Sequence, residues 1–280
     1  MKTRLLYMLL AFAGQIFTSA AQIKVAKDIG YGQEQSKVSN QLNVYYPADT
    51  VAKKGVVIFI HGGSWSSGKK ETYWWLGRNL ARKGLVGVII NYGLAPEQQY
   101  PQMAADCAAA VTWVSQHIHN YGGNPERIFL MGHSAGGHLA EFINADPEYL
   151  EAAGFKGKVK GVILNDAFGL DMNEYLSKAE KDDNYHNFLR TFSDDPVVWT
   201  KASPLNYVQQ IENPHLIFYG EKTYPAIQIQ SERIQKQLTA QQIPSSIYVI
   251  KGKKHVGMIS QMVFGSNQLY QKILDFVAQY

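Results

Sequence analysis

A serine between two glycines is the clearest chemical signal in the sequence. The motif GHSAG at residues 132–136 follows an apolar run and precedes a helical stretch. In that context a sharp strand-to-helix turn holds the serine in a strained backbone conformation, and the glycines let neighbouring backbone pass without a clash. The helix N-terminus behind the serine favours developing negative charge. The motif therefore predicts Ser134 as the nucleophile of an acyl transfer.

A glycine pair earlier in the chain supplies candidate donors for an oxyanion. The motif HGGSW follows a run of β-branched and aromatic residues that reads as a buried strand. Because glycine lets the backbone approach a ligand closely, we expect the N–H groups of Gly62 and Gly63, together with that of Ala135, to hold the oxyanion of a tetrahedral intermediate. Trp65 and His133 adjoin these donors in the chain and are candidate substrate contacts.

The nucleophile needs a base later in the chain. His255 lies in KGKKHVGM, after the last predicted strand and before the final helix. This placement predicts a loop at the carboxyl edge of the sheet, where sites of α/β proteins gather. The other histidines fit less well as a base. They fall in predicted helices, in a strand, in the long segment 171–207, in the HGGSW motif or directly beside the serine. We therefore expect His255 to be the general base.

The elements that must position these residues alternate between strand and helix. Buried-strand patterns occupy residues 56–60, 85–91, 127–131, 162–164, 216–219 and 247–250, and helical patterns occupy 72–83, 101–119, 135–144, 229–238 and 267–278. Two earlier segments, 23–25 and 42–46, read as antiparallel edge strands. This alternation predicts an α/β fold, with a mostly parallel central sheet covered by helices on both faces.

One connection is much longer than is usual between strands of such a sheet. Residues 171–207 carry many charges and, among them, the aromatic side chains of Tyr175, Tyr185, Phe188, Phe192 and Trp199. We expect this segment to be a helical lid inserted into a single domain that spans residues 22–280.

Taken together, these motifs resemble the α/β-hydrolase fold. HGGSW, NYGLAPEQQYP (91–101), YGGNPERI (121–128) and GHSAGGH (132–138) are similar in order and spacing to exported bacterial esterases. Those esterases are related to feruloyl and acetyl-xylan esterases, to kynurenine formamidase and to the hormone-sensitive-lipase group. The resemblance extends from about residue 44 to the C-terminus and implies acyl-transfer chemistry.

The acid of the expected triad departs from this resemblance. The family places an Asp three residues after the glycine that closes the fifth main strand, and here Thr223 holds that position. A threonine cannot stabilise an imidazolium by charge. Asp166, at the end of GVILND one strand earlier, is the expected replacement, since some lipases of this fold place their acid there. Glu221 is the alternative acid, and a weaker dyad is a third reading.

Composition narrows the classes of partner. The chain has 280 residues, a formal net charge of +4 and one cysteine, so neither a nucleic-acid surface nor a Cys-rich metal site is indicated. Residues 1–21 combine a basic start with a short apolar run and small residues, which predicts a cleavable signal peptide and a secreted or periplasmic protein without a stable membrane span.

These observations predict a serine carboxylic-ester hydrolase that works through an acyl-enzyme. No metal or organic cofactor is implied. From the resemblance, we expect small acyl or aryl esters as substrates, such as acetyl or feruloyl groups on carbohydrates. Two alternatives stay open: an amidase (an arylformamidase or a small serine peptidase), and a catalytically inactive binding protein on the same fold, which the missing Asp at Thr223 motivates.

Overall fold

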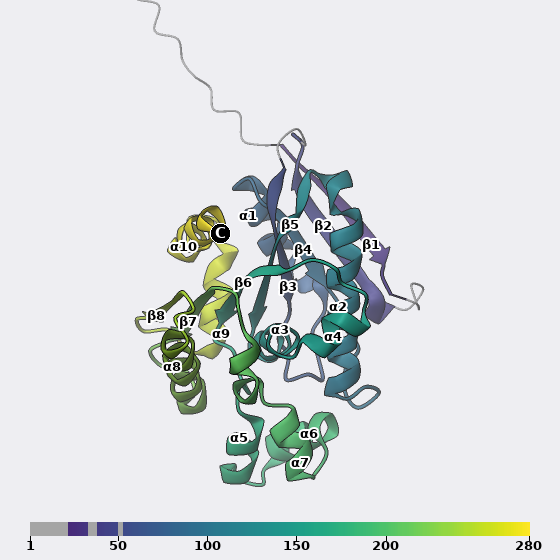
Figure 1. The fold of residues 1–280 in the computed structure, drawn as a ribbon. Helices are drawn as coiled ribbons and strands as arrows, with labels where there is room; N and C mark the ends of the chain where they lie inside the picture. The colour runs from purple at the N-terminus through teal and green to yellow at the C-terminus, as the bar shows by residue number, and fades with distance from the viewer. Residues whose placement is uncertain (1–21, 33–37, 50–52) are drawn as a thin grey trace, which may run out of the picture.

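An eight-stranded sheet runs through the centre of the molecule (Figure 1). The structure is a computed structural model that describes residues 22–32, 38–49 and 53–280. The strands are β1 (Ile23–Gly30), β2 (Gln41–Pro47), β3 (Lys54–Ile60), β4 (Val86–Ile90), β5 (Gly123–His133), β6 (Val159–Asn165), β7 (His215–Gly220) and β8 (Ser245–Ile250). Their spatial order is β1-β2-β4-β3-β5-β6-β7-β8.

The sheet is antiparallel at one edge and parallel elsewhere. β1 pairs with β2 and β2 with β4 in antiparallel fashion, whereas every pairing from β4 through β8 is parallel. The carboxyl ends of β3, β5, β6, β7 and β8 consequently meet at one edge of the sheet, where ligand sites of parallel sheets form.

Helices cover both faces of the sheet. They are α1 (Trp74–Arg82), α2 (Tyr100–His117), α3 (Ala135–Ala145), α4 (Pro147–Ala152), α5 (Met172–Lys178), α6 (Asp183–Phe192), α7 (Pro196–Lys201), α8 (Pro225–Ala240), α9 (His255–Ser260) and α10 (Gln268–Gln279). Along β3, Ile58 packs into the core shared with α2, α3 and α8, while Val57 and Phe59 pack into the core shared with α1, α9 and α10. A strand that is buried on both faces has a continuous run of apolar residues, and this run is the pattern that predicts a strand at residues 56–60.

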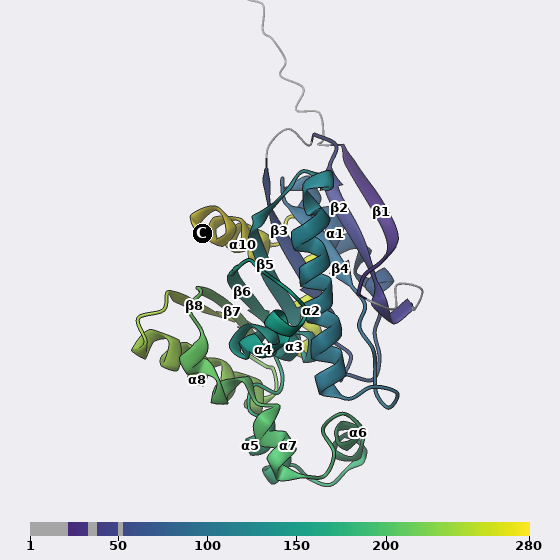
Figure 2. The same cartoon turned by 45° about the vertical axis from the view of Figure 1, so that its right-hand side comes forward.

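The segment 171–207 forms the helices α5, α6 and α7, which lie together beyond the end of the sheet (Figure 2). Each begins with an aspartate whose side chain accepts a backbone N–H: Asp171 from Glu174 (2.8 Å), Asp182 from Tyr185 (2.9 Å) and Asp195 from Val197 (2.8 Å). Such caps stabilise short helices that lack the length to be stable alone. The inward-facing side chains Phe188 and Phe192 join the main core.

The sequence-based fold is confirmed in architecture and corrected in detail. The mostly parallel sheet, the two edge strands and the helical insertion are all present. α8 begins at Pro225, earlier than expected, because a proline suits the first turn of a helix. His255 is the first residue of α9 and does not lie in an open loop. The predicted signal peptide, residues 1–21, lies outside the described residues, and none of the helices described is long and apolar enough to cross a bilayer.

The close approach of α3 to β3 gives a test of the packing. A Cβ on Gly136 would lie 2.1 Å from the backbone oxygen of Ile60, whereas a Cβ on Gly257, also helical, would come no nearer than 3.6 Å to the flexible Lys253 side chain. We expect Gly136→Ala to lower the free energy of unfolding by about 2–3 kcal/mol, because backbone cannot yield as a side chain does. Gly257→Ala is the matched control and should be neutral or slightly stabilising. Denaturant unfolding of both variants measures this, and equal stability would contradict the packing argument.

Candidate active site

Three side chains from the ends of three strands converge at the carboxyl edge of the sheet. Ser134 follows β5, Asp166 follows β6 and His255 stands just after β8. His255 Nε2 lies 2.8 Å from Ser134 Oγ, and His255 Nδ1 lies 2.6 Å from Asp166 Oδ2. Since a carboxylate only accepts, Nδ1 carries the proton toward Asp166 and Nε2 is free to accept the serine proton. This is the arrangement of a nucleophile, a base and an orienting acid.

The serine stands on a strained turn. The backbone of Ser134 has φ 56° and ψ −125°, a combination that residues other than glycine rarely adopt. A Cβ on Gly132 would lie only 2.1 Å from the backbone oxygen of Gly136, so the turn requires glycine there. Ser64 and Asp166 also have positive φ, so three of the seven such non-glycine residues in the described chain belong to this site. Backbone strain is therefore concentrated where the chemistry is expected.

Asp166 is the carboxylate that contacts His255. Its side chain is fully buried, and besides the histidine it accepts the N–H of Gly220 at 2.8 Å and the hydroxyl of Thr223 at 2.5 Å. Glu221, the alternative acid, is exposed and accepts the N–H of Gly252 at 2.8 Å, away from His255. Thr223, in the position where the resemblance expects Asp, thus donates a hydrogen bond to the carboxylate that stands next to the base.

The loop after β3, residues 61–67, contains the predicted oxyanion donors Gly62 and Gly63. Hydrogen bonds accepted by the carbonyl oxygens of these two glycines hold the loop in place. His61 Nδ1 donates to the oxygen of Gly62 at 2.8 Å, and Ser67 donates both its N–H and its hydroxyl to the oxygen of Gly63, each at 2.9 Å. Because a trans peptide places N–H opposite C=O, the amides of Gly63 and Ser64 face the other side of the loop. Burial lowers the pKa of His61 to about 4, so its ring remains a neutral donor.

Two predicted oxyanion residues adjoin the serine directly. A Cβ on Gly62 would lie 3.0 Å from the Ser134 Cβ, so this backbone packs against the nucleophile. The N–H of Ala135, the first residue of α3, has no partner within its helix, as for any first-turn amide. The structure brings Gly62 and Ala135 next to Ser134, and their role as oxyanion donors stays a prediction.

His133 lies behind the base and does not line the pocket, contrary to the expectation of a substrate contact. Its ring stacks on that of His255, with centroids 4.9 Å apart, and its Nε2 lies 3.2 Å from the His255 carbonyl oxygen. Burial, followed by the neighbouring His255, lowers the pKa of His133 to about 3. A neutral ring therefore supports the base from behind.

Trp65 is likewise displaced from its expected role. Its side chain is fully buried and is absent from the pocket lining. The indole Nε1 donates to His138 Nδ1 at 3.2 Å, and the rings of Phe188 and Phe192 pack against it edge-on at 5.5 and 4.8 Å. The positive φ of Trp65 turns the side chain inward beneath the insertion, where it anchors that segment to the core.

A cavity of about 290 Å³ opens onto Ser134 and His255. Its walls combine the turn after β6, the insertion and the start of α8. Beyond the two catalytic candidates, the lining residues are Ser64, Phe168, Tyr175, Asn184, Phe188, Tyr224, Pro225 and Ala226. Sequence reasoning missed these residues individually, although the aromatic content of 171–207 was the signal that could have indicated them.

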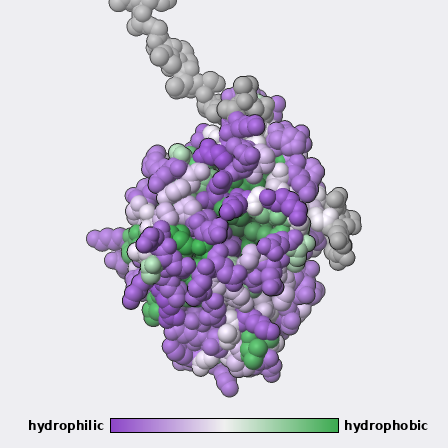
Figure 3. Space-filling model, in the orientation of Figure 1, coloured by the Kyte–Doolittle hydropathy of each residue, from purple (hydrophilic) through white to green (hydrophobic). Residues whose placement is uncertain are grey.

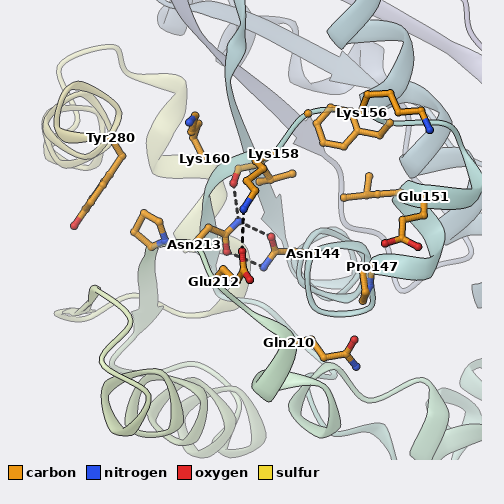
Figure 4. A pocket seen from close by; sticks show the side chains of 15 residues that line it. Asn144, Pro147, Glu151, Lys156, Lys158, Lys160, Gln210, Glu212, Asn213 and Tyr280 are labelled. Carbon is orange, nitrogen blue, oxygen red and sulfur yellow. Dashed lines mark hydrogen bonds and ion pairs between the residues drawn. The ribbon is translucent and has the colours of Figure 1, made fainter.

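A larger cavity of about 890 Å³ lies at the amino ends of β6 and β7, at the opposite edge of the sheet (Figure 4). Its polar side chains pair with each other: Lys158 with Glu212 at 3.1 Å, and Asn213 with Asn144 at 2.6 Å. Neither serine nor histidine is among its lining residues, so we do not assign the chemistry there. Figure 3 shows that the face of the molecule seen in Figure 1 is largely hydrophilic, with apolar side chains gathered in a few patches. Within the described part of the chain, no group of histidine, cysteine and carboxylate side chains forms a metal site.

Comparison with known proteins agrees with this geometry. The model of the BD-FAE family matches residues 42–238. A probable isoprenylcysteine alpha-carbonyl methylesterase of Arabidopsis thaliana is 27% identical over 90% of this chain, which spans 56% of that protein's length. Kynurenine formamidase of Danio rerio is 26% identical over 88% of this chain and 80% of its own. The crystal structure of esterase B from Lactobacillus rhamnosis superposes with a TM-score of 0.75 at 22% identity, covering 92% of this chain and 87% of the other, which shows the α/β-hydrolase fold.

Two variants distinguish which of the candidate acids, Asp166 or Glu221, belongs to the triad. We expect Asp166→Asn to lower kcat for ester hydrolysis on the order of 10⁴-fold, because the amide cannot stabilise the imidazolium and permits the wrong tautomer. Glu221→Gln, which removes a charge that accepts the N–H of Gly252 and lies away from His255, should leave kcat nearly unchanged. Steady-state kinetics of both folded variants measures this, and the reverse ranking would remove Asp166 from the triad.

The Thr223 hydroxyl should be needed to orient the acid. We expect Thr223→Val to lower kcat about tenfold with little change in KM, since one hydrogen bond to a charged group is lost near the reacting atoms. Thr223→Ser keeps the donor and should restore most of the rate. A valine variant as active as wild type, or a serine variant as impaired as valine, would contradict this role.

Proposed function

Because the chain belongs to the BD-FAE family, we propose that it is a serine carboxylic-ester hydrolase. The observation that carries the proposal is the continuous hydrogen-bond chain from Ser134 through His255 to the buried Asp166, at the mouth of a cavity. The binding-protein alternative is disfavoured, because a protein without catalysis has no need to maintain this geometry or the strain at Ser134.

In the proposed mechanism, His255 Nε2 takes the hydroxyl proton of Ser134 as Oγ attacks the ester carbonyl carbon. The carbonyl oxygen becomes an oxyanion that the N–H groups of Gly62, Gly63 and Ala135 stabilise. Asp166 holds the resulting imidazolium through Nδ1. His255 returns the proton to the departing alcohol, which leaves an acyl-enzyme. Water, deprotonated by the same histidine, then releases the acid and regenerates the serine.

The proposed substrates are small acyl or aryl esters, such as acetyl or feruloyl groups carried on carbohydrates. The walls of the catalytic cavity support these substrates, because four aromatic side chains line it beside the nucleophile: Phe168, Tyr175, Phe188 and Tyr224. Phe168 packs edge-on against Tyr175 with centroids 4.8 Å apart, which leaves apolar ring surface facing a bound acyl or aryl group. Export through the segment 1–21 is part of the same proposal, since esters on polysaccharides lie outside the cell.

An arylformamidase is the second candidate, favoured by the similarity to the kynurenine formamidase of Danio rerio. The same nucleophile and oxyanion donors would serve an amide. Comparing kcat/KM for an aryl acetate with that for the matched N-formyl arylamine decides between the two. A higher value for the formamide would replace the esterase proposal with the amidase.

The proposed function is tested with p-nitrophenyl acetate. We expect residues 22–280 to hydrolyse this ester, and Ser134→Ala to lose activity on the order of 10⁶-fold in kcat, because the nucleophile is removed. A fluorophosphonate probe should label the wild type and leave the folded alanine variant unlabelled. Well-folded wild type that neither hydrolyses the ester nor takes up the probe would favour the binding-protein alternative.

A further inference from the structure

A second cavity adjoins the catalytic one. A cavity of about 200 Å³ lies between α5 and α8, and Tyr175 and Ala226 line both it and the cavity at Ser134. The shared wall is narrow, because one of its two residues carries only a methyl group. A ligand that fills the first cavity and extends past Ala226 would enter the second.

The surface of the second cavity is mainly apolar. Ala179, Ala226 and Ile229 contribute its hydrocarbon wall, and Ile229 keeps 53% of its surface exposed. A large exposed aliphatic side chain beside a cavity is a feature that binding sites use.

The polar groups around this cavity are already engaged. The side chain of Gln230 accepts the N–H of Asp171 at 3.1 Å and donates to its carbonyl oxygen at 3.0 Å. Glu174 pairs with Lys178 at 2.9 Å and with Arg233 at 3.0 Å. These charges therefore neutralise each other at the rim, and an incoming ligand meets chiefly apolar surface.

We propose that the second cavity is a distal subsite for the apolar tail of the ester substrate. This inference rests on the ester hydrolysis of the proposed function, and it extends the substrates beyond the small esters named there to esters with a hydrocarbon group longer than the catalytic cavity holds. The tail belongs either to the acyl group or to the alcohol, since both leave the carbonyl carbon at Ser134. The ring of Tyr175, packed against Phe188 with centroids 5.8 Å apart, would form the side of the passage.

The test uses two pairs of esters, and the two esters of each pair differ only in the length of one hydrocarbon group. p-Nitrophenyl octanoate carries a long acyl group and octyl acetate a long alcohol, and each is compared with its short counterpart, p-nitrophenyl acetate or ethyl acetate. We expect Ile229→Asp to lower the ratio of kcat/KM for one long ester to that of its short counterpart about tenfold, because burying about two methylene groups contributes a factor of that size. The pair of esters whose kcat/KM ratio falls shows whether the subsite binds the acyl group or the alcohol group.

Val249→Asp is the matched control. Val249 is an exposed aliphatic residue (52%) on β8 and lines neither cavity, so its substitution should leave both ratios as in wild type. Ala226→Phe is a second variant, which should close the passage and lower the same ratio.

Two failures are distinguishable. An active protein whose ratios are unaltered by both Ile229→Asp and Ala226→Phe would overturn the subsite while leaving the esterase in place. A wild type inactive toward all four esters would overturn the proposed function and the subsite with it.

Discussion

The hydrogen bond between His255 Nδ1 and Asp166 Oδ2 links residues 89 positions apart and determines how the site is assembled. A fully buried carboxylate is costly unless its oxygens are satisfied. Here Gly220, Thr223 and His255 supply three donors from β7, the turn after it and α9. The strands β6, β7 and β8 must therefore end at matching heights, which their parallel register provides, with Leu164 beside Ile217 and Ile217 beside Ile247.

This dependence explains how the acid can stand after β6 when the resemblance expects it after β7. The two strands are neighbours, and the N–H of Asp166 donates to the carbonyl oxygen of Phe218 at 2.7 Å. The carboxylate that follows β6 therefore lies next to the turn after β7, where it accepts hydrogen bonds from Gly220 and Thr223. Thr223 stands at the position where the resemblance expects Asp, and its hydroxyl donates to Asp166. Asp166 has a positive φ, a backbone conformation that residues with a side chain rarely adopt.

Features that depend on residues adjacent in the chain could be predicted from the sequence. Apolar runs identified the strands, and the glycines around Ser134 identified the turn, because both depend on residues adjacent in the chain. The choice between Asp166 and Glu221 depends on the direction of two side chains at neighbouring strand ends, which one-dimensional spacing does not contain. His133 and Trp65 were assigned to the substrate for the same reason: both adjoin the site in sequence, and both turn their rings into the protein. The lining of the cavity comes from α5, α6 and α8, whose docking is set by long-range packing.

That packing connects substrate choice to stability. Phe188 contacts the buried Trp65 on one side and lines the catalytic cavity on the other, so the cluster that anchors the insertion also forms the wall of the pocket. A change at Phe188 would alter the cavity and loosen the insertion together. Residues such as Ile229 and Asn184 are different, because they touch the cavities without joining the buried core. Variation that reshapes the cavities at low cost in stability is therefore expected at the rim of α8 and at the start of α6, while the aromatic cluster beneath them is constrained by the core it completes.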